Sequence, residues 1–124
     1  MARRAVVVAV AAGCAALLPE ALHGAEDVRA GIGPPAALIV LLGVQVVAIA
    51  AAWRGRRRAV WLLLAIAVGW IAGALLDHPE VFTDPAGFRD GWSSALPVLA
   101  LVALNAVTAV SALLASLRTV KLEG

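Results

Sequence analysis

The sequence predicts an all-α fold, an integral membrane four-helix bundle formed by a single domain over residues 1–124. Two observations carry this prediction. Hydrophobic residues make up 63% of the chain and charged residues only 15%, and the apolar residues gather in four long runs. An average soluble domain has about a quarter of its residues charged. Because so small a chain cannot bury this much apolar surface in its own core, we expect lipid to solvate much of it.

The four apolar runs approach the length that a helix needs to cross a bilayer, about 20 residues. The predicted spans cover residues 5–22, 35–52, 59–76 and 95–117, with connections at 20–34, 53–58 and 77–94. Pro35 and Pro97 fall in the first turn of the second and fourth spans, where the missing N–H of proline costs least. The run of glycines and prolines from Gly31 to Pro35 separates the first two spans.

The first span has a short uninterrupted core, Ala5–Leu18, and carries Pro19 and Glu20 near its outer end. A run this short is also typical of the apolar region of a signal peptide. The residues after it lack a good site for signal peptidase, whereas Ala11-Ala12-Gly13-Cys14 is similar to a lipoprotein processing site. We expect an uncleaved helix, with lipidation at Cys14 as the alternative.

The turn Trp53-Arg54-Gly55-Arg56-Arg57-Arg58 sets the predicted orientation, since short cytoplasmic loops collect arginine. With this turn inside, eight of ten bases lie on the cytoplasmic side and seven of eight acids lie outside. The inner bases are Arg3, Arg4, Arg54, Arg56, Arg57, Arg58, Arg118 and Lys121. Both termini are then inside (N-in/C-in).

The charge and composition also bear on partners and location. The net charge of +2 is sorted by side instead of forming one basic surface, so we expect no nucleic-acid partner. The 29 alanines, and nine arginines against one lysine, indicate a GC-rich bacterial genome. The predicted location is the bacterial cytoplasmic (plasma) membrane, with the outer loops facing the periplasm or cell exterior.

The second outer loop is predicted to carry a short interfacial helix. Asp84 is suited to cap a helix that begins at Pro85 and ends near Arg89. The aromatic residues of this loop, Phe82, Phe88 and Trp92, are expected at the level of the lipid headgroups.

Histidines and acids of the two outer loops form a candidate metal site. These residues are His23, Glu26, Asp27, Asp77, His78 and Glu80. If the first and third helices are neighbours, two imidazoles and several carboxylates meet, a set that suits Zn²⁺, Mn²⁺ or Fe²⁺. The alternative is that these acids solvate the loops and pair with the histidines. No cofactor is predicted beyond such a divalent transition metal.

Two amides, Gln45 and Asn105, are predicted near the middle of the membrane. An unpaired amide is costly in hydrocarbon. They are therefore expected either to join helices by hydrogen bonds or to line a polar path.

Small residues mark two predicted helix-packing faces, because they let another backbone approach closely. One face is Ala65, Gly69 and Gly73 in the third span, and the other is Asn105, Ala109 and Ala112 in the fourth.

Several functional classes are disfavoured. No ionisable residue is predicted in the middle of a span, which argues against proton-coupled transport. The middle of the first span reads Ala-Val-Ala-Ala-Gly-Cys and lacks the mid-membrane glutamate of small multidrug-resistance transporters, and the Gly-Gly-x-x-Gly-Ala-x-x-Arg motif of fluoride channels is absent. There is no nucleophile–base constellation and no phosphate-binding loop, so no catalytic residue is predicted and the chain is not expected to be an enzyme.

The leading expectation is a non-enzymatic accessory or assembly subunit, or a homo-oligomer, that acts through helix packing. Its partners would be the lipid bilayer and other membrane helices, either its own copies or another subunit. An oligomeric channel or facilitator lined by Gln45 and Asn105 is the first alternative. A metal-binding or metal-sensing protein with the outer His/carboxylate site is the second.

Overall fold

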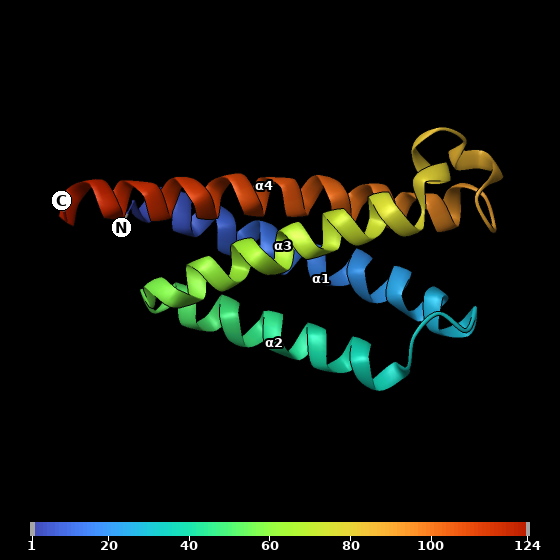
Figure 1. Ribbon diagram of the computed structural model, residues 1–124, viewed down its shortest axis with the longest axis horizontal. Helices are drawn as coiled ribbons and strands as arrows, with labels where there is room; N and C mark the ends of the chain where they lie inside the picture. The colour runs from blue at the N-terminus through green and yellow to red at the C-terminus, as the bar shows by residue number, and fades with distance from the viewer. Residues whose placement is uncertain (1, 124) are drawn as a thin grey trace.

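The computed structural model describes the backbone of residues 2–123 and the side chains of residues 2–118. It contains four long helices that run up and down (Figure 1). They are α1 (Arg3–Arg29), α2 (Pro35–Trp53), α3 (Arg57–Asp77) and α4 (Trp92–Glu123), with 3-10 turns η1 (Pro79–Phe82) and η2 (Pro85–Gly87) between α3 and α4. All four are long and apolar enough to cross a membrane. The predicted all-α fold, with four helices suited to crossing a membrane, is confirmed at this level.

Proline and glycine residues mark the connections between the first three helices. Pro35 opens α2, where its missing N–H is one of the unpaired groups of any helix start. Gly31 and Gly33 have φ of 81° and 80°, and Gly55 in the α2–α3 turn has φ of 83°. These left-handed conformations favour glycine, because a Cβ would clash with the backbone there.

The first helix is longer than predicted. α1 does not end near residue 22 but continues to Arg29, with Pro19 inside it, so the connection predicted over 20–34 shrinks to 30–34. Glu20, expected at the outer end of the first span where the connection begins, lies well inside the helix and is fully buried. The apolar run stops at Pro19, but the helix continues because its next turns find polar partners on other helices.

The α3–α4 connection also differs from the prediction. Asp84 accepts a hydrogen bond from the Gly87 N–H, as a capping residue does. The helix that follows is only the single 3-10 turn Pro85–Gly87. α4 then begins at Trp92, a little before the predicted start at residue 95.

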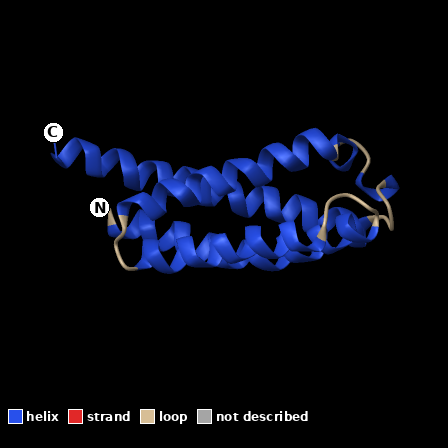
Figure 2. Ribbon diagram, turned by 60° about the horizontal axis from the view of Figure 1, so that its bottom comes forward, coloured by secondary structure: helices blue, strands red, loops and turns tan. Residues whose placement is uncertain are grey.

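The two ends of the bundle carry different groups (Figures 1 and 2). The α1–α2 and α3–α4 connections lie at one end, called here the loop end, and the chain termini and the α2–α3 turn lie at the other, called the termini end. Arg3, Arg54, Arg56 and Arg58 are thereby gathered at the termini end. Arg3 lies over the Trp53 ring, 4.4 Å from its centroid, and its Nη1 donates to the Trp53 carbonyl at 3.3 Å. The side chain of Lys121, counted with this group, lies outside the described residues.

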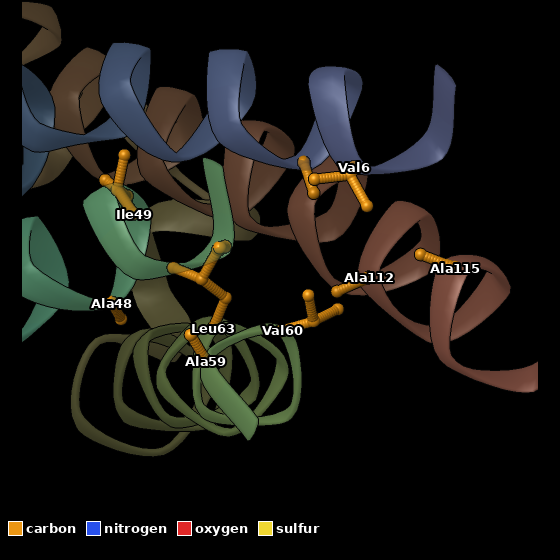
Figure 3. Close-up of a cluster of buried hydrophobic side chains, with 10 residues drawn as sticks. Val6, Ala48, Ile49, Ala59, Val60, Leu63, Ala112 and Ala115 are labelled. Carbon is orange, nitrogen blue, oxygen red and sulfur yellow. The ribbon is translucent and has the colours of Figure 1, made fainter. Parts of the chain in front are cut away.

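The hydrophobic core is divided into two clusters. The first, near the termini end, draws on all four helices (Figure 3). Its buried residues are Val6, Ala9, Ala48, Ile49, Ala52, Ala59, Val60, Leu63, Ala112 and Ala115. The second, near the loop end, is built mainly on α4 and the α3–α4 connection, from Ala74, Val81, Phe88, Ala95, Val98 and Leu101. Glu20, Gln45 and Asn105 form a buried polar layer between the two clusters.

Candidate functional site

Asp27 is the centre of a cluster of charged and polar side chains at the loop end. His23, one turn earlier on α1, places Nε2 3.2 Å from Asp27 Oδ2. His78, which follows the last residue of α3, places Nε2 3.1 Å from Asp27 Oδ1. The Arg89 guanidinium donates to the same Oδ1 at 2.6 Å. One carboxylate therefore connects α1, the end of α3 and the α3–α4 connection.

The two imidazoles are held by packing. Both histidines are 4% exposed. Their ring centroids lie 4.8 Å apart at an interplanar angle of 88°, and the Phe88 ring lies 5.3 Å from that of His78. Phe88 is itself buried and packs against His78. The sequence instead predicts it at the level of the lipid headgroups. Phe82 and Trp92, the other two aromatic residues of the predicted group, are exposed.

The remaining predicted metal ligands lie around this cluster. Glu26 accepts a hydrogen bond from the Ser94 hydroxyl at 2.8 Å, while its Oε2 is buried without a hydrogen-bond partner, 3.8 Å from Arg89 Nη1. Glu80 is half exposed, 3.8 Å from His78 Nδ1. Asp77 is exposed but lines a cavity of about 80 Å³ next to the histidines. Among the described residues, three of the six form a group in which every ligand atom lies within 4.8 Å of the others, namely His23, Asp27 and His78.

Arg89 is the residue of this cluster that the sequence did not single out. Its φ of 43° is the only positive value at a described residue other than glycine, a strained conformation that surrounding contacts must hold. The short bond to Asp27 is such a contact. Most basic residues of this chain lie on the predicted inner side, whereas Arg89 lies in an acidic outer loop. That exception was the feature of the sequence that could have identified Arg89 as a member of the cluster.

The arrangement of His23, Asp27 and His78 fits a metal-binding triad. Zinc holds nitrogen and oxygen ligands at about 2.0–2.2 Å, which puts two tetrahedral ligands about 3.4 Å apart. Asp27 Oδ2 lies 3.2 Å from His23 Nε2 and 3.4 Å from His78 Nε2, close to that value. Two histidines and one carboxylate also form the triad of many Fe²⁺ sites. The adjacent cavity of about 80 Å³ has room for an ion and a water molecule.

The buried polar layer joins all four helices. Asn105 Nδ2 on α4 donates to Glu20 Oε2 on α1 at 2.8 Å and to the Leu101 carbonyl at 2.8 Å. Gln45 on α2 donates to the Gly13 carbonyl of α1 at 3.2 Å and accepts from Trp70 Nε1 of α3 at 3.1 Å. Both amides thus make hydrogen bonds between helices. Glu20 was missed because its partner lies 85 residues away in the sequence.

The two predicted helix-packing faces have different surroundings. Asn105 and Ala112 are buried inside the bundle, and Ala109 beside them is partly buried. Ala65, Gly69 and Gly73 instead line an apolar groove of about 510 Å³ between α2 and α3, together with Leu41, Ile66 and Trp70. Apart from the adjacent residues and backbone of its own helix, a Cβ at Gly69 or Gly73 would meet no atom of the described residues within 4 Å. The third-span face is therefore open, whereas the fourth-span face is largely used within the chain.

The remaining predicted residues are at the surface. Arg54, Arg56 and Arg58 are exposed in the α2–α3 turn, and Arg57 begins α3 partly buried. Cys14, the predicted lipidation site, is exposed on α1.

Comparison of the chain with protein-family models, with curated proteins and with solved structures finds no match.

Proposed function

We propose that this multi-pass membrane protein binds a divalent transition metal ion through His23, Asp27 and His78. The observation that carries the proposal is the convergence of these side chains from α1 and from the end of α3, over 50 residues of sequence. Imidazole and carboxylate ligands suit Zn²⁺, Mn²⁺ and Fe²⁺. Three protein ligands leave a coordination position for water or a further ligand, which suits a protein that senses or hands on an ion.

Arg89 gives the site a second state. A metal ion and the Arg89 guanidinium compete for the Asp27 carboxylate, since both are cations and the charge of the carboxylate is shared by its two oxygens. Glu26 Oε2 lies 3.8 Å from Arg89 Nη1 and has no hydrogen-bond partner. On metal binding, Arg89 transfers its interaction from Asp27 to Glu26. Exchange of one ion pair for another keeps the α3–α4 connection attached to α1 in both states.

The proposed orientation follows the arginine-rich turn. With Arg54, Arg56, Arg57 and Arg58 in the cytoplasm, the loop end and its metal site face the periplasm or the cell exterior of a bacterial plasma membrane. Single cysteines introduced in a Cys14→Ser background at Glu80 and at Arg56 test this. A membrane-impermeant thiol reagent applied to intact cells should label only the cysteine at position 80. Labelling of position 56 alone would show that the protein has the opposite orientation.

Metal analysis of the purified full-length protein tests the function. After incubation with Zn²⁺, Mn²⁺ or Fe²⁺ and removal of free ion, we expect about one ion per chain. His23→Ala with His78→Ala should abolish retention, and Asp90→Asn, a change of an exposed acid in the same connection, should not. Retention unchanged by the double substitution, or no retention by the unchanged protein, refutes the proposal.

Glu26→Gln is a finer test of the same site. It leaves all three ligands in place but weakens the alternative partner of Arg89. Outer-shell changes of this kind commonly weaken metal affinity about tenfold or more. Calorimetric titration should show this loss in Glu26→Gln and full affinity in Asp90→Asn, whose side chain is exposed. Equal affinities of the two variants would remove the Arg89 exchange from the proposal.

A second candidate function is association with another copy or subunit through the open groove of α3. The observation that favours it is that, apart from the adjacent residues and backbone of its own helix, no described atom lies within 4 Å of a Cβ at Gly69 or Gly73. Small residues allow close helix–helix approach in lipid. Gly69→Leu and Gly73→Leu should then lower the oligomeric state in detergent, while Ala103→Leu on an exposed position of α4 should not. A mass by light scattering unchanged in both glycine variants refutes it.

A further inference from the structure

Glu20 is a carboxylic acid in the centre of the bundle. It is 0% exposed and lies on α1 between the two hydrophobic clusters. Oε2 accepts the 2.8 Å hydrogen bond from Asn105, and Oε1 is buried without a partner. The sequence predicts no ionisable residue in the middle of a span, because a first helix that ends near residue 22 leaves Glu20 close to its outer end. With α1 continuing to Arg29, Glu20 becomes such a residue.

Among the side chains described, through residue 118, no basic group faces Glu20 from the helices packed around it. α2 has no charged residue between Pro35 and Trp53. The charged residues of α3 and α4 lie at the helix ends. At 1.5 Å per residue, Arg29 and Arg4 lie along α1 about 14 and 24 Å from Glu20. The groups that face Glu20 from its neighbours are neutral amides, Asn105 on α4 and Gln45 on α2.

The nearest titratable groups along α1 lie toward the loop end. His23 is three residues from Glu20, and its Nδ1 is buried without a partner. Asp27, the next titratable residue on that face, is already paired with His23, His78 and Arg89. In the other direction, the turns of α1 that precede Glu20 run toward the termini end. The residues that they place in the core are all buried and apolar: Ala16, Ala12, Ala9 and Val6. Glu20 is therefore closer to the aqueous medium at the loop end.

A carboxylate without a neighbouring cation is very costly in a low-dielectric interior, by tens of kcal/mol in the idealised case. The carboxyl group avoids that cost by holding a proton or a small metal cation. A metal cation needs several oxygen ligands. The described groups that face Glu20 are instead the side-chain amides of Asn105 and Gln45, which offer it N–H donors and not a shell of oxygen ligands. A neutral acid needs fewer polar partners and fits these surroundings better.

We propose that Glu20 is a proton-binding site in the core of the bundle, one that exchanges its proton with the medium at the loop end. This site is separate from the metal triad, since it uses another side chain and needs no metal ion. Ionisable residues buried within membrane spans commonly mark proton relays. A proton held about one helical turn from a cation site gives the protein the two components of proton-coupled cation handling.

Infrared spectroscopy of the full-length protein in liposomes, with a metal chelator present, tests this proposal. At pH 7, solvent-exposed carboxyl groups are ionised. We expect a carbonyl band of a protonated acid to remain, and to shift when the protein is labelled with ¹³C-glutamate. The band should disappear in Glu20→Gln and persist in Glu26→Gln. Only carboxylate bands from glutamate at pH 7, or a protonated-acid band that survives in Glu20→Gln, would overturn the proposal.

Two further measurements keep the test decisive if Glu20→Gln does not fold. In Asn105→Leu the carbonyl loses its hydrogen-bond donor, so the band should move to higher frequency; a band that does not move belongs to another residue. Replacing Na⁺ with a bulky organic cation separates the two possible occupants. A glutamate carboxylate band that changes on this replacement would show a sodium site in place of a proton site and would refute the proposal.

Discussion

The hydrogen bond between Glu20 and Asn105 provides the sharpest test of how this bundle is held together. Both side chains are almost fully excluded from solvent, at 0% and 1% exposure. Asn105→Leu removes the 2.8 Å bond to Oε2, and Oε1 already has no partner, so both oxygens are left unsatisfied. A buried polar group left without its partner costs about 1–3 kcal/mol. We expect Asn105→Leu to destabilise the protein by about 2 kcal/mol.

The partner substitution should cost less. Glu20→Leu leaves Asn105 Nδ2 its second bond, to the Leu101 carbonyl, so we expect a loss of about 1 kcal/mol. Replacing both partners by apolar residues removes the unsatisfied groups altogether. The double variant should therefore be about as stable as Glu20→Leu alone, an interaction energy of about 2 kcal/mol.

The assay is reversible unfolding in mixed detergent micelles, followed by helical circular dichroism. Thr108→Val is the control, because the Thr108 hydroxyl donates at 2.9 Å to the Leu104 carbonyl of its own helix. It should change stability less than Asn105→Leu. If the effects of Glu20→Leu and Asn105→Leu add within about 0.5 kcal/mol, the two side chains are not coupled and the reasoning is wrong.

Two further predictions concern packing. Phe88→Ala should destabilise the loop end strongly, by up to about 3–5 kcal/mol as for other buried phenylalanines, whereas Phe82→Ala, at 38% exposure, should cost much less. Hydrogen exchange of the α3–α4 connection measures this, and equal effects would contradict the placement of Phe88 against His78. Gly24→Ala should cost about 1–3 kcal/mol, because its Cβ would lie within 3.2 Å of three Leu38 side-chain carbons. Leu38→Ala should recover part of the loss, and Gly43→Ala, with nothing within 4 Å, should be tolerated; a Gly24→Ala protein as stable as the parent refutes the close approach.

The four helices follow from features that are local in the sequence. Apolar runs of the right length, Pro35 at a helix start and Gly55 in a turn act over a few residues, so sequence alone was sufficient for them. The predicted end of α1 was wrong because it was set by the end of the apolar run. The helix itself continues, because the polar residues that follow find hydrogen-bond partners. The partner of Glu20 is Asn105 on α4, 85 residues later in the sequence.

The sequence identified most residues of the candidate site but not how they are arranged. His23, Asp27 and His78 were identified from residue type and from their position at helix ends. The position of Phe88 against His78 was not, because an aromatic residue in a membrane-protein loop is suited equally to the lipid headgroups and to a small core. Arg89 was not either, since its role depends on a left-handed backbone that places its side chain against α1.

The polar layer between the two hydrophobic clusters has a consequence for the uniqueness of the fold. Alanine supplies six of the ten buried residues of the first cluster, so the contact surfaces of its helices look much the same from one turn to the next. Sliding a helix by one turn, about 5.4 Å, would replace small side chains with similar ones at little cost. The Asn105–Glu20 and Gln45–Trp70 bonds can form in one axial register only, so a buried polar pair here selects a single alignment. A chain that lacks these bonds is expected to stay helical while its helices sample several alignments.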